Sequence, residues 1–385
     1  MLRFLTAGES HGESLIAVLE GLPSGLEIDS SQVNTELGRR QKGYGRGKRM
    51  EIESDKVEFV SGLRGGRTLG SPLCMRIRNR DWENWLNTMA PEGRNRDPRT
   101  VSSPRPGHAD LAGGIKYGHQ DFRNILERAS ARETAARVAV GAVAKALLQR
   151  CGVTVGGHVL SIGGSKPSNA QYNKPVEGVS AETSPVRCLD RSAEKEMIEL
   201  IDIAAEKGET LGGVFEIRAF DLPVGLGSHV QWDRRLDADL AFAVMSIPAI
   251  KGVQIGSGFK GAGLPGSAVH DAIFHDTTRG FYRDTNNAGG IEGGISNGET
   301  VVLSAAMKPI PTLMSPLASV HFLSKRKVDA AVERSDVTAV PAACVIGESM
   351  VAFVLAKHMC EKFGGDSMEE MLNNLENYQD YVKKL

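Results

Sequence analysis

Two histidines lie in glycine-rich loops whose small neighbours give an imidazole little to pack against. His11 follows Ser10 within residues 8–12 (GESHG), and His108 lies within residues 105–110 (RPGHAD). A single loop histidine is usually a solvated side chain, but two such loops are more than turns require. Because imidazole titrates near neutral pH, both positions suit general acid–base catalysis. His11 and His108 are therefore the first candidates for chemistry.

Cations around the start of an expected helix indicate an anion site. Arg128 and Arg132 flank Ser130, which has Glu133 three residues further on in the spacing of a capping box. The free N–H groups and the dipole of a helix N-terminus already favour an anion. Arginines at that end oppose the dipole unless a phosphate or carboxylate compensates them. We therefore expect a bound anion beside Arg132.

A basic tract lies at the end of an earlier expected helix and in the glycine-rich loop after it. It holds six cations and no acid within eleven residues: Arg39, Arg40, Lys42, Arg46, Lys48 and Arg49. Further on, Arg334 and Asp336 precede a helix expected from Pro341. Each segment alone is compatible with a solvated surface. Together they predict that several arginines hold an anionic ligand.

Three glycines have the spacing of a dinucleotide-binding fingerprint, namely Gly256, Gly258 and Gly261. That fingerprint must open a helix, whereas Pro265 and Gly266 interrupt the segment where the helix should run. We therefore expect no Rossmann turn here.

The elements that position these residues follow from apolar periodicity, caps and breakers. Strands are expected over residues 2–6, 14–20, 153–162, 212–220, 252–257 and 300–307. Helices are expected over residues 29–42, 130–152, 193–207, 235–247, 341–363 and 367–384.

A repeated phrase suggests an internal duplication, because LPSGL at residues 22–26 returns as LPVGL at residues 222–226. We expect an α+β fold in which residues 1–385 form a single large domain of two similar halves. In this β-α sandwich, antiparallel sheets pack together and helices lie outside. Residues 366–385 are expected to form a C-terminal helix of unassigned role.

Composition excludes several classes of protein. The chain has 385 residues, 41% of them hydrophobic and 24% charged, and a net charge of -1, which is typical of a globular protein and not of a general nucleic-acid binder. Five scattered cysteines without a Cys-x-x-Cys pair indicate neither a disulfide framework nor a metal site. The N-terminus leaves no room for a signal peptide, and we expect arginine or lysine to interrupt every long apolar stretch, so we expect a cytoplasmic protein without membrane contact.

Taken together, these segments resemble the chorismate synthase family. The resemblance rests on both histidine loops, on residues 39–47 and 116–118, and on Arg128 to Glu133. It continues in family order through residues 236–239, 245–252, 287–291, 308–309 and 334–336. The sequence differs from the family pattern at Ala129, where many members have a second serine. In addition, no family motif covers the tail after Gly365.

The resemblance implies a carbon–oxygen lyase of the shikimate pathway, which leads to aromatic amino acids. Such an enzyme eliminates phosphate from 5-enolpyruvylshikimate 3-phosphate in a trans-1,4 sense and releases chorismate. The resemblance further implies reduced FMN as cofactor without net redox change, and a homotetramer. The hydrogen lost from the ring is not acidic enough for a carboxylate to remove unaided, which explains the need for a flavin. Because no reductase domain is evident, we expect an external source of reduced FMN.

The resemblance also assigns roles to residues. The phosphate and two carboxylates of the substrate need several cations, and the matched ones are Arg40, Arg46, Arg49, Arg105, Arg132 and Arg334. His11 is expected to protonate the leaving phosphate, His108 to lie against the flavin, and Asp336 to hold flavin N5. Ser10 and Ser130 complete the catalytic set. The expected FMN contacts are Arg128, Ala129, Ser130, Pro248, Ala249, Gly293, Lys308, Pro309, Ile310, Pro311, Thr312 and Arg334.

Two other functions stay open on the residues alone. A flavin- or NAD(P)H-dependent oxidoreductase without a Rossmann turn would consume NAD(P)H with its substrate. A non-catalytic RNA-binding protein would use the basic tract, although this tract lacks the interleaved aromatic side chains of a stacking platform.

Overall fold

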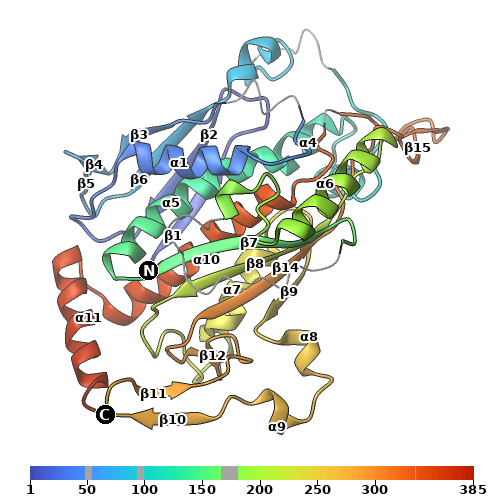
Figure 1. Cartoon of the computed structure of the whole chain (residues 1–385). Coiled ribbons are helices and arrows are strands. Elements are labelled where there is room, and N and C mark those ends of the chain that lie inside the picture. The colour runs from blue at the N-terminus through green and yellow to red at the C-terminus, as the bar shows by residue number, and fades with distance from the viewer. Residues whose placement is uncertain (48–53, 93–98, 166–180, 334) are drawn as a thin grey trace.

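The computed structural model describes residues 1–47, 54–92, 99–165, 181–333 and 335–385. Two four-stranded antiparallel sheets form its frame (Figure 1). The first has the order β1-β2-β6-β3, from β1 (Arg3–Ala7), β2 (Ser14–Glu20), β6 (Leu73–Arg78) and β3 (Val57–Ser61). The second has the order β7-β8-β14-β9, from β7 (Thr154–Ile162), β8 (Gly213–Phe220), β14 (Val301–Met307) and β9 (Ile250–Ile255).

The two sheets have equivalent strand orders. In the first sheet β6 lies between β2 and β3, although it follows both in the sequence, and in the second sheet β14 lies between β8 and β9 in the same way. The repeated phrases occupy matching turns. In the first half, the Thr68 hydroxyl donates to the carbonyl oxygen of Pro23 at 2.6 Å. In the second half, the Ser296 hydroxyl donates to the carbonyl oxygen of Pro223 at 2.7 Å. The two phrases therefore hold equivalent positions in the two halves.

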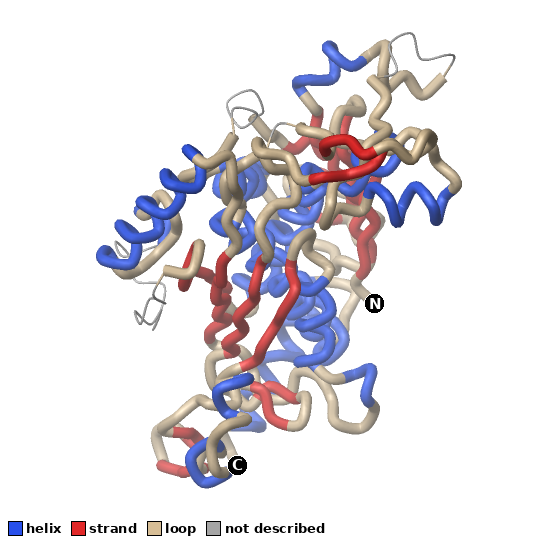
Figure 2. The backbone as a smooth tube through the Cα atoms, turned by 90° about the vertical axis from the view of Figure 1, so that its right-hand side faces the viewer, coloured by secondary structure: helices blue, strands red, loops and turns tan. Residues whose placement is uncertain are grey.

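The long helices lie between the sheets, which corrects the expectation of sheets packed together with helices outside (Figure 2). α5 (Thr134–Arg150) packs on the first sheet, α10 (Val340–Phe363) packs on the second, and the two helices pack on each other. Their buried residues surround most of each helix axis. A helix that is apolar all round has no face for water, so it belongs in the middle layer.

α10 is long and apolar enough to cross a membrane, although 89% of its apolar window is buried inside the fold. Residues 340–356 of this helix contain one acid, Glu348, and no arginine or lysine, so the expectation that arginine or lysine interrupts every long apolar stretch is wrong. α5 and the second sheet cover its surface. This environment is that of a core helix in a soluble protein.

The remaining long helices pack on this frame. α1 (Ser30–Gln41) packs on α5, α10 and β3, and α7 (Leu236–Met245) packs on α10 and β9, so both extend the middle layer. α6 (Arg191–Glu206) packs on β7. α11 (Met368–Val382) packs on α10. The N–H of Met368 also donates to the carbonyl oxygen of Ser24 at 2.9 Å, so the C-terminal helix covers the turn of the first repeated phrase.

Helix starts agree with the sequence in one case and differ in another. Asp29 and Gln32 form the complete capping box at α1. Ser130 caps a short 3-10 turn, η2 (Ala131–Glu133), by accepting from the N–H of Arg132 at 3.3 Å. The capping box predicted a second hydrogen bond, from the N–H of Ser130 to the carboxylate of Glu133. That prediction is wrong, because this carboxylate instead accepts from the Thr6 hydroxyl at 2.8 Å.

Short elements complete the fold. The other helices are α3 (Asp110–Tyr117), α4 (Arg123–Ala129), α8 (Gly258–Gly261), α9 (Gly266–Val269) and the 3-10 turns η1 (Arg80–Trp85), η3 (Ala181–Thr183) and η4 (Trp232–Arg234). Two-stranded ribbons pair β4 (Leu63–Arg64) with β5 (Arg67–Thr68), β10 (Ile273–Asp276) with β11 (Gly280–Arg283), β12 (Ile291–Glu292) with β13 (Ile295–Ser296), and β15 (Ala318–Val320) with β16 (Lys327–Asp329). The glycines 256–261 open only the four-residue α8, which is not the helix of a Rossmann turn.

Candidate active site

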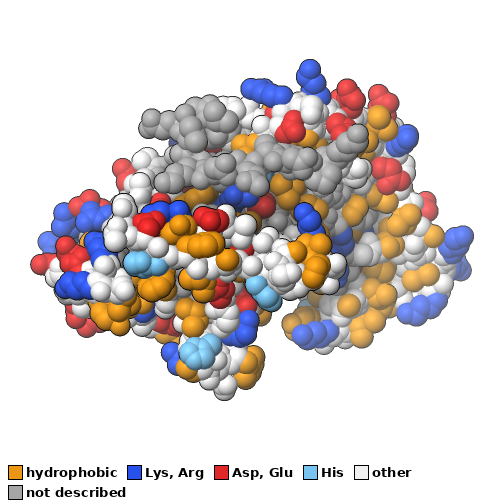
Figure 3. Space-filling view, turned by 60° about the horizontal axis from the view of Figure 1, so that its bottom comes forward, with side chains coloured by type: hydrophobic (Ala, Val, Ile, Leu, Met, Phe, Trp, Pro, Cys, Tyr) orange, Lys and Arg blue, Asp and Glu red, His pale blue; other side chains and the backbone are white. Residues whose placement is uncertain are grey.

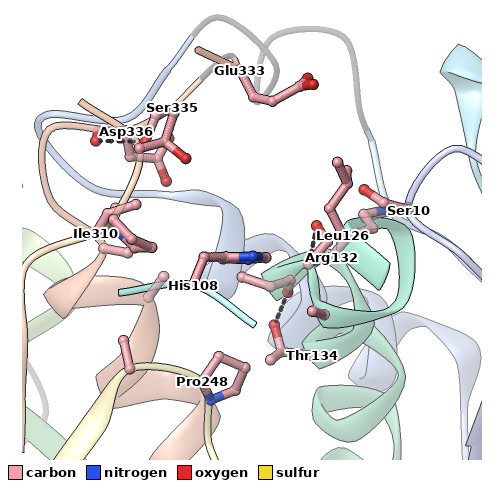
Figure 4. Close-up of a pocket in the computed structure, with 18 of the residues that line it drawn as sticks. Ser10, His108, Leu126, Arg132, Thr134, Pro248, Ile310, Glu333, Ser335 and Asp336 are labelled. Carbon is pink, nitrogen blue, oxygen red and sulfur yellow. Dashed lines mark hydrogen bonds between the residues drawn. The ribbon is translucent and has the colours of Figure 1, made fainter. Parts of the chain in front are cut away.

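A cavity of about 770 Å³ lies where loops of both halves meet the N-terminal ends of α5 and α10. Figure 4 shows Asp336, Ile310 and His108 on one side of it and Ser10 and Arg132 on the other. Pro248 closes it below in this view. The chain therefore brings segments that are hundreds of residues apart in sequence into one site.

Both central helices begin at this cavity. Thr134 is the first residue of α5, Ala342 and Ala343 lie in the first turn of α10, and all three line the cavity. Both helices are described in full, and neither has an acidic residue in its first turn. The positive ends of the two helix dipoles are thus uncompensated from within each helix and favour a bound anion.

His11 is held by a carboxylate that the sequence reasoning missed. Its Nδ1 lies 2.9 Å from Oε1 of Glu127, and its backbone N–H donates to Oε2 of the same residue at 2.8 Å. The ring stacks on Trp85 with centroids 3.9 Å apart. Burial raises the pKa of Glu127, but the contacts to His11 and Arg123 outweigh it and hold this pKa below its ordinary value. Glu127 is therefore a carboxylate when it holds the ring.

His108 has a similar arrangement around Asp110. Its Nδ1 lies 2.5 Å from Oδ1 of Asp110, and Arg105 donates from Nε to Oδ2 at 2.8 Å. Burial opposes the charged form of Asp110, but His108 and Arg105 outweigh this and lower its pKa well below the ordinary value. Arg105 also donates to the Thr312 hydroxyl at 2.9 Å, which ties the His108 loop to the segment after β14.

Arg40 and Arg132 share one buried carboxylate. Arg40 donates to Oδ2 of Asp55 at 3.0 Å, and Arg132 donates to Oδ1 at 2.6 Å and to Asn79 at 2.8 Å. Burial lowers the pKa of Arg40 to about 10; Asp55 opposes this shift and the neighbouring cations Arg132 and Arg46 add to it. One carboxylate against two guanidinium groups leaves a net positive charge, as an anion site requires.

Arg46 and Asp336 pair across two loops. Arg46 lies 2.9 Å from Oδ2 of Asp336, and the N–H of Gly47 donates to Oδ1 at 2.6 Å. A Cβ on Gly47 would stand 2.9 Å from the carbonyl oxygen of Ser335, so this approach of the two backbones needs glycine. The loop after α1 therefore fixes the position of the Asp336 carboxylate.

The cavity also has an apolar wall. It is formed chiefly by Ile247, Pro248, Ala249, Met307, Ile310, Pro311, Ala339, Ala342, Ala343 and Ile346. Ala249 has φ of 69°, a left-handed conformation that non-glycine residues adopt at a cost and that is common at functional sites. Its carbonyl oxygen accepts from the N–H of Lys308 at 2.9 Å. The strained turn thus joins two stretches of the wall.

Known proteins resemble this chain over its whole length. A family model described as chorismate synthase matches residues 2–360. The chain belongs to the chorismate synthase family. It is 58% identical to the chorismate synthase of Desulforudis audaxviator (strain MP104C) over 100% of this chain and 98% of that protein. It is 57% identical to that of Desulforamulus reducens (strain ATCC BAA-1160 / DSM 100696 / MI-1) over the full length of both.

A solved structure titled "Crystal Structure of Chorismate Synthase" matches with a TM-score of 0.81 at 46% identity, covering 100% of this chain and 99% of that one. These relationships make the chain a phosphate-eliminating lyase of the shikimate pathway. They also confirm the family resemblance and an α+β fold with antiparallel sheets.

Most residues expected from the chorismate synthase motifs meet at the cavity. The lining includes Ser10, His11, Arg40, Arg46, Arg105, His108, Ala129, Ser130, Arg132, Pro248, Ala249, Lys308, Ile310, Pro311, Thr312 and Asp336. Arg49 and Arg334 lie outside the described residues.

Three expected FMN contacts do not line the cavity of this single chain. Arg128 donates to the carbonyl oxygen of Thr6 in β1 and to that of Gly8 just after β1, both at 3.0 Å. Gly293 lies in the turn between β12 and β13, and Pro309 lies beside lining residues without being one. Their assignment rests on resemblance alone.

Proposed function

We propose that this chorismate synthase family member eliminates phosphate from 5-enolpyruvylshikimate 3-phosphate and uses reduced FMN without net redox change. One observation carries the proposal: the cavity lining combines four buried or half-buried arginines with a set of apolar side chains. A substrate with one phosphate and two carboxylates suits the arginines, and a flat ring system suits the apolar side chains.

The residues present fit a flavin. The turn with Pro248 and Ala249, together with Ile310 and Pro311, offers apolar contact to a ring, and His108 projects toward the middle of the cavity (Figure 4). Reduced FMN, when bound, supplies a transient electron to the substrate and recovers it at the end of the reaction. The polar side chains that would hold the ribityl chain and the phosphate of FMN are those of Ser130, Lys308 and Thr312.

The remaining roles belong to the protein's own side chains. Arg40, Arg46, Arg105 and Arg132 bind the anionic groups of the substrate, and Arg49 and Arg334 keep this role by family resemblance. His11, with Ser10 beside it, gives a proton to the leaving phosphate oxygen. His108 stabilises negative charge beside the flavin ring. The Asp336 carboxylate, held by Arg46 and Gly47, is positioned for proton transfer in the step after phosphate loss.

An anaerobic assay tests the proposal. With the substrate and dithionite-reduced FMN, the protein should release chorismate and phosphate in equal amounts, and oxidised FMN should give neither product. Turnover with oxidised FMN, or a requirement for NAD(P)H with every substrate molecule, would favour an oxidoreductase over this chemistry.

The setting of the enzyme is part of the same proposal. We infer one domain of two similar halves that works in the cytoplasm as a homotetramer and takes reduced FMN from an external source. Its five cysteines are free, as in a reducing compartment. Apolar side chains gather on the face that carries β10 and β11, which supports association with further copies of the chain (Figure 3).

A further inference from the structure

Glu127 makes more contacts to the loop of His11 than packing of α4 requires. Its side chain is 1% exposed and accepts from both the backbone N–H and Nδ1 of His11. Its own carbonyl oxygen accepts from the N–H of Ser10 at 2.9 Å. One residue thus binds two successive residues of the loop through three separate acceptor atoms.

These contacts decide the tautomer of His11. A carboxylate can only accept, so Nδ1 must carry the hydrogen that lies between the two groups. The stack on Trp85, with an interplanar angle of 24°, fixes the plane of the ring. With Nδ1 engaged by Glu127, the other ring nitrogen, Nε2, is the one left for chemistry in the cavity that His11 lines.

The surroundings of Glu127 support a dedicated role. Arg123 donates to its Oε1 at 3.2 Å and to Glu333 at 3.0 Å, so the carboxylate has a cationic partner besides His11. Arg123 also lies over the Trp85 ring, with its guanidinium carbon 5.1 Å from the centroid. The ring of His11 is thereby fixed at its nitrogen, at its face and through its backbone.

We propose that Glu127 is the positioning residue of His11: it accepts from Nδ1–H, so that the imidazolium form of the ring donates from Nε2 to the leaving phosphate oxygen and is left as the neutral Nδ1–H tautomer. The proton leaves Nε2 and binds the phosphate oxygen as the carbon–oxygen bond breaks, while Glu127 keeps its charge throughout. This inference rests on the proposed role of His11 and extends it to a residue on α4.

A double-mutant cycle tests the proposal in the FMN-loaded enzyme. By analogy with other carboxylates that orient a catalytic imidazole, Glu127→Gln should lower kcat by about 10²- to 10⁴-fold and change the KM for the substrate less than about threefold. In the His11→Ala background the same substitution should lower kcat by less than about twofold, because Glu127 then has no imidazole to orient. Glu292→Gln, which alters a Glu–Arg pair on β12, serves as the control and should leave kcat unchanged.

A structural role predicts a different pattern, in which Glu127→Gln lowers kcat by the same factor in both backgrounds. That result, or full activity of Glu127→Gln, would overturn the proposal. If circular dichroism shows that Glu127→Gln does not fold, Glu127→Asp replaces it in the same cycle, because its shorter side chain moves the carboxylate away from Nδ1. The two outcomes are then interpreted in the same way.

Nitrogen NMR of the ring gives a readout that is independent of turnover. Wild-type protein labelled with ¹⁵N at histidine should show a slowly exchanging proton on Nδ1 of His11, and Glu127→Gln should lose it. Absence of this signal in the wild type refutes the positioning claim. If the signal is present but His11→Ala keeps full kcat, the proposed role of His11 fails while the contact to Glu127 stands.

Discussion

At the scale of single residues, the cavity combines charges that are individually costly to bury. The guanidinium groups of Arg40 and Arg132 share Asp55, and Arg105 binds Asp110. Each pair has little exposure to water, and an unpaired buried charge costs several kcal/mol. Because the arginines of the first group outnumber their carboxylate, the folded protein keeps a positive charge that a phosphate or carboxylate of the substrate neutralises.

Asp336→Asn tests whether phosphate loss and the step that follows it can be observed separately. We expect the variant to fold and to bind FMN and substrate, because Asn can still accept from the N–H of Gly47. The step after phosphate loss should slow by about 10²- to 10⁴-fold, the usual contribution of a positioned acid or base. Single-turnover measurements should therefore show phosphate release ahead of chorismate formation. Equal rates of both products at the wild-type level would refute the role of Asp336.

The sequence predicted the histidines and arginines of the site better than their partners. Histidine in a glycine-rich loop and arginine at a helix start conflict with their local surroundings, and such conflicts point to function. Glu127 and Asp55 have no such local signal: a glutamate within a helix is ordinary, and Asp55 meets Arg132 from 77 residues away. Only the tertiary structure brings these carboxylates to their cations.

At the scale of elements, the middle layer depends on a very close approach of α5 and α10. A Cβ on Gly141 would stand 2.2 Å from Cβ of Ser349. Gly141→Ala should therefore separate the helices and destabilise the protein by about 1–3 kcal/mol or more, as overpacking does. Gly38→Ala in α1 is the matched control, since a Cβ there meets nothing within 4 Å.

Gly38→Ala should be neutral or stabilising by up to about 1 kcal/mol, because alanine favours the helix. Urea denaturation of the two variants measures both effects. Equal stability of Gly141→Ala and Gly38→Ala would contradict the packing derived for α5 and α10.

A buried ionic cluster ties the three helices α1, α5 and α10 together beside the site. Glu348 is fully buried and accepts from Arg39 at 2.8 Å, from Lys145 at 2.7 Å and from Arg187 at 2.8 Å. Burial opposes its charged form, but these three cations outweigh burial and lower its pKa well below the ordinary 4.5. Because Arg39 precedes Arg40, the cluster also anchors the end of α1 at the cavity.

The depressed pKa of Glu348 sets a direction for stability against pH. A carboxyl group whose pKa falls on folding stabilises the protein above its ordinary pKa of 4.5 and loses this contribution as the pH falls toward the folded value. The free energy of unfolding should thus decrease below about pH 5.

Glu348→Gln should cost about 3–5 kcal/mol at pH 7, because it leaves buried cations without their partner. Its stability should also change less than that of the wild type on acidification. Thermal melts from pH 7 to pH 3 measure both, with the exposed Glu376→Gln as control. A wild-type slope retained in Glu348→Gln would show that other carboxylates dominate.

The long helices and six of the eight strands of the two main sheets were predicted, since caps, breakers and apolar periodicity are local, whereas β3 and β6 were not. The layer order was not. The alanine-rich pattern of α5 and the apolar run of α10 predicted helices. Which face of each sheet packs on these helices depends on tertiary contacts, which local sequence patterns do not encode. The repeated LPxGL phrase was informative, because it places two similar turns in the two halves.

At the scale of the whole molecule, the chain leaves a large apolar surface uncovered on β10, β11 and the segment before them. Phe259 is 83% exposed and Phe281 is 63% exposed. If further copies cover this surface, Phe259→Asp with Phe281→Asp should dissociate a tetramer into smaller species without unfolding it. Sedimentation velocity measures the change, and Tyr381→Asp on α11 is the control. An unchanged sedimentation coefficient in the double variant would place the interface elsewhere.

The two halves contribute different kinds of side chain to the cavity. The first half supplies most of the cations and both histidines, and the second supplies much of the apolar wall with Asp336. A reduced flavin held by the residues that line this cavity would supply the transient electron that the elimination needs. The central claim is therefore an elimination in which reduced FMN acts as a catalyst and is not consumed.

The ratio of chorismate formed to reductant consumed tests this claim most directly. Under strict anaerobic conditions, a single addition of reduced FMN, equal in amount to the protein, should support many turnovers. Chorismate and phosphate should appear in equal amounts, and the reduced-flavin absorbance after substrate exhaustion should equal its starting value. Consumption of one reductant for each chorismate, or a halt after one turnover per FMN, would contradict the account.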